Sequence, residues 1–104
     1  MRREEMALHM QELFNDCVAA RKAGQEEYAR DDDNAFRNFE RISAYLNIPK
    51  EQVLLVYLMK HMDGIAAHVS GCQLQREPVR GRIVDAITYL TLLSGMLEGG
   101  QKAG

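Results

Sequence analysis

The sequence predicts an all-α protein, a four-helix bundle that is completed by homo-oligomerisation. Apolar residues recur at intervals of three and four along four segments, which is the period of an amphipathic helix. The connections are short and carry Gly, Pro and Asn, and no segment alternates apolar and polar residues as a strand would. The 104 residues form a single helical domain, with helices expected at 1–23, 34–46, 49–70 and 78–98, an acidic loop at 24–33 and a tail at 99–104.

The composition is that of an ordinary globular chain and excludes several classes of function. Hydrophobic residues make up 46% and charged residues 27% of the chain, and the net charge is −2. This balance gives no basic footprint for non-specific binding to nucleic acid. The longest apolar run, Val53 to Met59, is too short to span a bilayer. Because Cys17 and Cys72 form no metal motif and no secretory signal is recognisable, we expect reduced thiols in a cytoplasmic protein.

The first expected helix, 1–23, is bounded by charges that suit the helix dipole. Glu4 and Glu5 lie in its first turn and Arg21 and Lys22 in its last, and Gly24 is expected to end it. Its apolar stripe consists of Met6, Met10, Leu13, Cys17 and Ala20.

The acidic loop contains three consecutive aspartates, Asp31 to Asp33, and allows two interpretations. In the first it is a solvated turn, and Asp32 or Asp33 caps the next helix. In the second the carboxylates hold a divalent cation through oxygen ligands. The helix that follows, 34–46, buries Phe36, Phe39 and Ile42, and Pro49 is suited to the first position of the next helix.

The central helix, 49–70, is apolar on every side in its first half, so we expect neighbours to bury it from several directions. Lys60 lies on one line with Val53, Val56 and Gly64, among apolar and small residues. Its ammonium group therefore either reaches along the surface to water or faces a pocket. A salt bridge to Asp63, three residues further on, is the structural alternative.

The last helix, 78–98, carries two rows of apolar residues, of which the second is the more informative. Asp85 heads that row, and a carboxylate beside apolar residues needs a partner or a ligand. The sequence allows two interpretations of Asp85: it forms a structural ion pair, or it belongs to a functional site. Two helices with more than one apolar face exceed what a small bundle buries by itself, which predicts a homo-oligomer. The second row consists of Asp85, Tyr89, Leu92 and Met96.

The polar residues follow one another in a recognisable order: Lys22, Tyr28, the block Asn38-Phe39-Glu40-Arg41, Lys60-His61, Asp85 and Tyr89. This order resembles the pattern in small all-α proteins of phage genomes, the nucleotide-modification-associated domains, and the match spans 22–96. Those domains resemble, more distantly, the MazG-type nucleoside triphosphate pyrophosphohydrolases, so the resemblance implies a MazG-like bundle.

The resemblance implies a nucleotide ligand, a phage setting in the host cytoplasm and, from the MazG-type enzymes, a Mg²⁺ cofactor. Those enzymes hold magnesium with paired glutamates on one helix and a Glu-x-x-Asp motif on a later one. Here the later motif is Arg82-Ile83-Val84-Asp85, with arginine in place of the first acid, and Glu26-Glu27 lacks a third acid at Arg30. The acids best placed to replace the missing ligands are Glu40, Asp63 and Asp85.

The resemblance also suggests roles for individual side chains. Lys60 would bind phosphate and, with Asp85, take part in catalysis. Arg37 and Arg41 could clamp phosphate oxygens or be ordinary surface charges. His61 could exchange protons near neutral pH or be a half-exposed structural histidine. The expected nucleotide-binding residues are Tyr28, Asn38, Arg41, Lys60, His61 and Tyr89.

Two functional hypotheses follow. The first is a magnesium-dependent nucleotide pyrophosphohydrolase. The second is a protein that binds a nucleotide without chemistry, for example one that sequesters a host nucleotide signal to counter a host defence. The incomplete set of acids puts catalysis, but not nucleotide binding, in question. A purely structural helical oligomer is the third possibility.

Overall fold

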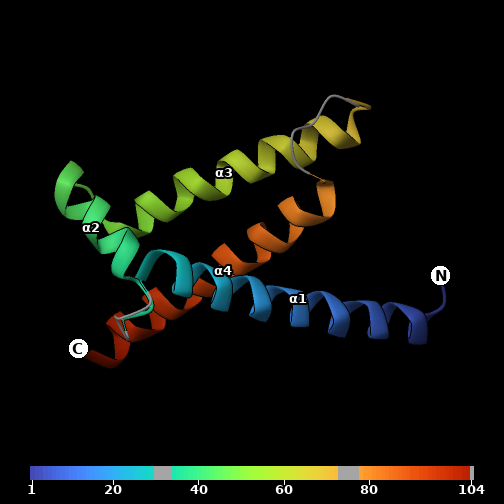
Figure 1. Ribbon diagram of the computed structural model, residues 1–104, viewed down its shortest axis with the longest axis horizontal. Coiled ribbons are helices and arrows are strands. Elements are labelled where there is room, and N and C mark those ends of the chain that lie inside the picture. Colours follow the sequence, from blue (N-terminus) through green and yellow to red (C-terminus); the bar gives the residue numbers. More distant parts are fainter. Residues whose placement is uncertain (30–33, 73–77, 104) are drawn as a thin grey trace.

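The computed structural model describes residues 1–29, 34–72 and 78–103. These residues form four helices and no strand (Figure 1), so the all-α prediction is confirmed for this part of the chain. None of the described helices is long and apolar enough to cross a membrane. The helices are α1 (Arg3–Ala29), α2 (Arg37–Leu46), α3 (Lys50–Val69) and α4 (Val79–Ala103).

Helix α4 is the element against which both long neighbours pack. Its contacts with α3 are the most extensive in the described structure, and those with α1 come next. Helix α2 packs on α3 and touches α1, whereas α1 and α3 do not contact each other within the described residues. In Figure 1, α1 and α3 diverge from the α2 end of the molecule. Each of them therefore keeps a side that no other described helix covers.

The main core lies where α2, the first half of α3 and the second half of α4 meet. Leu54 is completely buried, and Phe39, Val53 and Met96 surround it. Their positions follow from the amphipathic spacing of the three helices, because each helix turns its stripe of apolar residues toward the others. This cluster is the largest source of hydrophobic stabilisation in the described chain.

Helix α1 is joined to α4 by a smaller contact. Cys17 is buried there, and its Sγ donates to the carbonyl oxygen of Val84 at 3.6 Å. An ion pair of 2.7 Å between Arg80 and Asp16 connects the same helices at the surface, with both side chains about half exposed. Because exposed pairs contribute about 0–1 kcal/mol, the packing of Cys17 matters more to this contact than the ion pair does.

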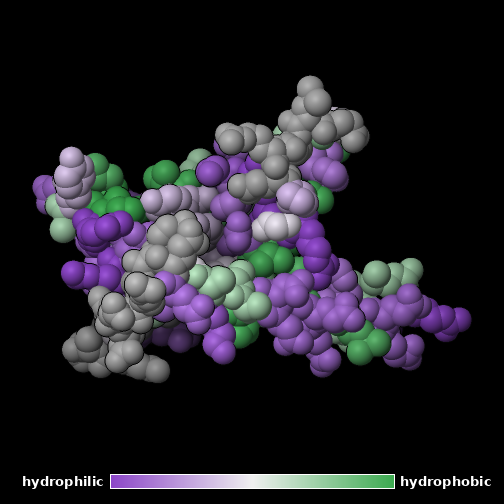
Figure 2. Space-filling model, in the orientation of Figure 1, coloured by the Kyte–Doolittle hydropathy of each residue, from purple (hydrophilic) through white to green (hydrophobic). Residues whose placement is uncertain are grey.

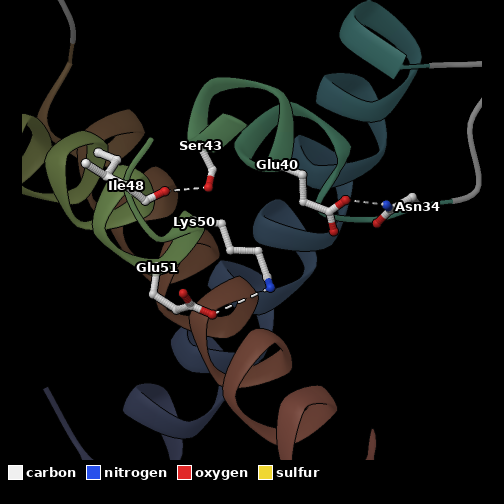
Figure 3. Close-up of polar contacts among 6 residues, drawn as sticks. All are labelled: Asn34, Glu40, Ser43, Ile48, Lys50 and Glu51. Carbon is white, nitrogen blue, oxygen red and sulfur yellow. Dashed lines mark hydrogen bonds and ion pairs between the residues drawn. The ribbon is translucent and has the colours of Figure 1, made fainter. Parts of the chain in front are cut away.

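The corner between α2 and α3 is tight. Asn47 takes up the left-handed conformation (φ 58°, ψ 46°) that ends α2, a conformation which asparagine tolerates better than most residues. The hydroxyl of Ser43 donates to the carbonyl oxygen of Ile48 across this corner (Figure 3). Pro49 then lies at the N-cap of α3, one position before the expected one.

Two predicted helix ends are wrong. Helix α1 passes through Gly24 and ends at Ala29, so the first part of the expected acidic loop is helical. A hydrogen bond of 2.8 Å from Arg21 to Gln25, one turn apart, supports the helix across the glycine. Helix α4 likewise continues past Glu98 to Ala103, where a tail was expected. The aspartates proposed as caps, Asp32 and Asp33, lie outside the described residues, and the N-cap of α2 is Phe36.

The expected burial of α3 on several sides does not occur among the described residues. Leu55, Val56 and Met59 are 42%, 65% and 62% exposed. The reason is the position of α1, which packs on α4 and leaves this side of α3 without a neighbour among the described residues.

Gly64 of α3 allows a side chain of α4 to cross it closely. A Cβ atom at this position would lie 2.5 Å from the Cδ, Nε and Cζ atoms of Arg82. The Nε atom of Arg82 is buried in this crossing and has no hydrogen-bond partner among the described residues. The absence of a side chain at Gly64 is therefore what lets the guanidinium group lie against α3.

Replacing Leu54 by Ala is expected to lower the free energy of unfolding by about 2–5 kcal/mol, because it leaves a cavity in the core. Urea unfolding followed by circular dichroism measures this loss. Leu97→Ala removes the same atoms at a position that is 53% exposed and should change the free energy by only about 0.5 kcal/mol. Equal losses in the two variants would contradict the described core.

Replacing Gly64 by Ala should stabilise the protein less than replacing Gly24 by Ala, which lies inside α1 at a position where a Cβ meets nothing within 4 Å. Both changes improve helix propensity by about 1 kcal/mol, but only the first displaces Arg82. In an Arg82→Ala background the two substitutions should become equivalent. A difference that persists in this background, measured by thermal unfolding, would refute the close crossing.

Candidate ligand pocket

A pocket of about 480 Å³ lies between the second half of α1, the start of α2 and the middle of α4. Its size is within the range of small-molecule sites. Helix α3 contributes none of its described lining residues. Those residues are Ala20, Arg21, Ala23, Gly24, Gln25, Asn34, Ala35, Arg37, Asn38, Phe39, Asp85, Thr88, Tyr89 and Leu92.

Arg21 ties the two sides of the pocket together. Its Nη2 donates to Oε1 of Gln25 at 2.8 Å and to the carbonyl oxygen of Ala35 at 2.9 Å. Since Ala35 belongs to the turn before α2, the guanidinium group fixes this turn against α1. A second guanidinium group, that of Arg37, lines the pocket from the first residue of α2.

Two asparagines complete the α2 side. The Oδ1 of Asn34 accepts a hydrogen bond from the backbone nitrogen of Phe36 at 3.0 Å, and its Nδ2 donates to Oε2 of Glu40 at 2.8 Å (Figure 3). Asn38 is half-buried, and its Oδ1 accepts from Nη2 of Arg41 at 2.9 Å. The turn is therefore held by its own side chains, with amide groups at the pocket surface.

Asp85 and Tyr89 face the pocket from α4 because they lie one turn apart on the same side of the helix. The carboxylate of Asp85 is 43% exposed, and its Oδ2 is 3.6 Å from Nε2 of His61. This separation is long for a hydrogen bond, so the contact is one of charge or dipole.

An aromatic cluster supports Tyr89 from behind. The ring of Tyr89 stacks on Tyr57 at a centroid distance of 6.0 Å and meets the edge of Phe39 at 6.2 Å. His61 lies 5.6 Å from the same ring and is only 6% exposed. Its Nδ1 is buried and has no hydrogen-bond partner among the described residues. These contacts leave Tyr89 little freedom to move.

Of the residues predicted to bind a nucleotide, Asn38 and Tyr89 line the pocket together with Asp85. His61 touches the last two from α3. Arg41 is exposed and reaches the pocket only through Asn38. Lys60 is exposed on α3, is not among the lining residues and forms no ion pair with Asp63 in the described chain. The side chain of Tyr28 lies outside the described residues.

The acids expected to hold Mg²⁺ are not brought together. Glu40 bonds to Asn34, Asp63 is exposed on α3, and Asp85 faces His61. Among the side chains that the structure describes, no three from His, Cys, Asp or Glu are grouped as a metal site requires. Glu40, Asp63 and Asp85 therefore do not form a shared set of oxygen ligands in the described structure.

Sequence reasoning missed Arg21, Gln25 and Asn34 as lining residues. Arg21 was explained by the helix dipole, an explanation that fails because α1 continues well beyond it. The spacing of four between Arg21 and Gln25 was the available signal for a continuing helix.

Comparison with known proteins gives no assignment: no family model, curated protein or solved structure matches the chain.

Replacing His61 by Phe should leave the free energy of unfolding unchanged or raise it by about 1–3 kcal/mol. Phenylalanine fills a similar space beside Tyr89 and removes the unpartnered Nδ1. Chemical denaturation of this variant and of Asp85→Asn, which removes only the charge opposite His61, measures the effect. A clear loss of stability in both variants would mean that the His61–Asp85 contact holds the fold together.

Proposed function

We propose that this pocket binds a nucleotide or nucleotide-derived small molecule and holds it without converting it. The observation that carries the proposal is the convergence of two guanidinium groups, amide side chains and an aromatic wall on one cavity of about 480 Å³. Phosphate, base and sugar each require one of these kinds of partner.

The charge of the described lining favours an anionic ligand. Arg21 and Arg37 are opposed by a single lining carboxylate, that of Asp85. Guanidinium groups bind phosphate oxygens through paired, charge-assisted hydrogen bonds. Arg21 is already oriented by Gln25 and Ala35, so it loses little freedom when an anion binds.

The opposite wall suits a base or a sugar. Tyr89 presents a fixed aromatic surface, and the amide of Asn38 can hydrogen-bond to a base edge. Asp85 can accept hydrogen bonds from an amino group or from hydroxyls. In the phage setting that the resemblance implies, such a protein would sequester a host nucleotide signal in the host cytoplasm as an anti-defence measure.

A magnesium-dependent pyrophosphohydrolase is the alternative, and the exposed carboxylate of Asp85 within the pocket favours it. Glu40 and Asp63 lie apart from Asp85, however, so no step through a metal ion can be derived from these residues. Retention of the nucleotide requires only the lining described above.

Native mass spectrometry of a nucleotide panel, with and without Mg²⁺, tests the proposal by recording both the complex and any products. We expect a nucleotide to be retained intact in the absence of metal. Conversion that requires Mg²⁺ would contradict the non-catalytic proposal and support the pyrophosphohydrolase.

Arg21→Gln should weaken binding about tenfold or more, because it removes a charge-assisted hydrogen bond to the ligand. Arg3→Gln makes the same change at an exposed site near the other end of α1 and should leave affinity unaltered. Isothermal titration calorimetry measures both. Binding that is lost in Lys60→Ala but kept in Arg21→Gln would move the site to α3 and refute the pocket.

Asp85→Asn separates the two functions. If the protein only binds an anionic nucleotide, the variant should bind equally well or more tightly, because a negative charge has been removed from the pocket. If the protein is a hydrolase, turnover should be abolished. The same titration, combined with product analysis, distinguishes the two results.

A further inference from the structure

The side of α3 opposite to its core face is both apolar and exposed. Its residues follow one another at alternating intervals of four and three, the repeat of a helix that pairs with another helix along a seam. Leu55, Met59, Met62 and Val69 are 42%, 62%, 49% and 80% exposed. The full repeat, called the α3 seam below, is Leu55, Met59, Met62, Ala66 and Val69.

Nothing in the described chain covers the α3 seam. Helix α3 turns Val53, Leu54 and Leu58 toward its neighbours α4 and α2, and α1 does not reach it. Val56, which is 65% exposed, widens the same apolar face. Figure 2 shows hydrophobic residues at the surface over the α2 end of the molecule. A continuous apolar face on a helix marks an interaction surface.

We infer that the α3 seam pairs with the α3 seam of a second copy, with the two helices antiparallel. An exposed apolar repeat of alternating fours and threes packs well against another of the same kind, and a second copy of this chain supplies one. In this pairing Met59 packs against Met62 of the partner subunit, and Leu55 against the partner's Ala66. The two-fold axis makes every contact occur twice.

The charges beside the α3 seam favour the antiparallel direction. Lys60 and Asp63 are both exposed on one flank, with no ion pair between them in the described chain. In the antiparallel pairing Lys60 lies within about 3 Å, along the helix axis, of the level of the partner's Asp63. A parallel pairing would instead set this flank against the opposite flank of the partner helix, so Lys60 would not meet the partner's Asp63. Opposite charges beside a seam select both partner and direction.

This pairing is independent of the proposed ligand. The described lining of the pocket comes from α1, α2, α4 and the turn before α2, so an interface on α3 leaves the pocket accessible. It also assigns Lys60 to an interface, where sequence analysis expected a phosphate ligand.

Sedimentation analysis tests the surface. The unaltered protein should be a dimer at micromolar concentration, and Met59→Glu should raise its dissociation constant about tenfold or more by placing a charge in the seam. Phe14→Glu introduces the same charge on α1, at a position that is 48% exposed, and should leave the dimer intact. A monomeric unaltered protein, or a dimer broken by Phe14→Glu and not by Met59→Glu, would overturn the inference. Circular dichroism verifies that each variant keeps its helices.

A charge exchange tests the direction. Lys60→Glu and Asp63→Lys should each weaken self-association, because like charges then face each other across the antiparallel seam. Mixing the two variants should restore a dimer, since each new charge meets its opposite in the other chain. Loss of a charge pair within one helix cannot give this rescue. Single variants that associate as well as the unaltered protein, or a mixture without gain, would refute the antiparallel pairing.

Discussion

The packing of α4 against two helices at once is the constraint from which the rest of the structure follows. One side of α4 meets α3, where Met96 joins the main core, and another meets α1, where Val84 accepts from Cys17. Because α1 and α3 lie against different parts of α4, they do not cover each other within the described residues. Because α4 separates α1 from α3, each of these two helices keeps a side that no other described helix covers.

The pocket is the consequence on the α1 side. Asp85 and Tyr89 lie beside the α1 contact, and the turn before α2 closes the space between the two helices. The position of this turn depends on the guanidinium group of Arg21, which bonds to the carbonyl oxygen of Ala35. Behind Tyr89, the rings of Tyr57, Phe39 and His61 form a support that belongs to the core. The pocket wall is therefore packed directly against the core.

The α3 seam is the consequence on the other side. The pocket and the α3 seam differ in chemistry. The pocket is concave and is lined by charged and amide groups, whereas the seam is convex and apolar. A small polar ligand can satisfy the first, because its hydrogen-bonding groups are grouped around one cavity. A long apolar stripe on a helix is satisfied by another helix, because the contact must extend along the whole stripe to exclude water.

The sequence by itself determined the helices and their apolar faces, since the intervals of three and four depend only on the geometry of one helix. It also marked Asp85 and Tyr89, which share a face of α4 by spacing alone. Only the tertiary structure decided that Asn38 and Arg21 lie beside them, that Lys60 and Asp63 do not, and that Leu55 and Met59 of α3 are exposed. These outcomes depend on how α1 and α3 lie against α4, and the interval between residues on separate helices carries no information about that.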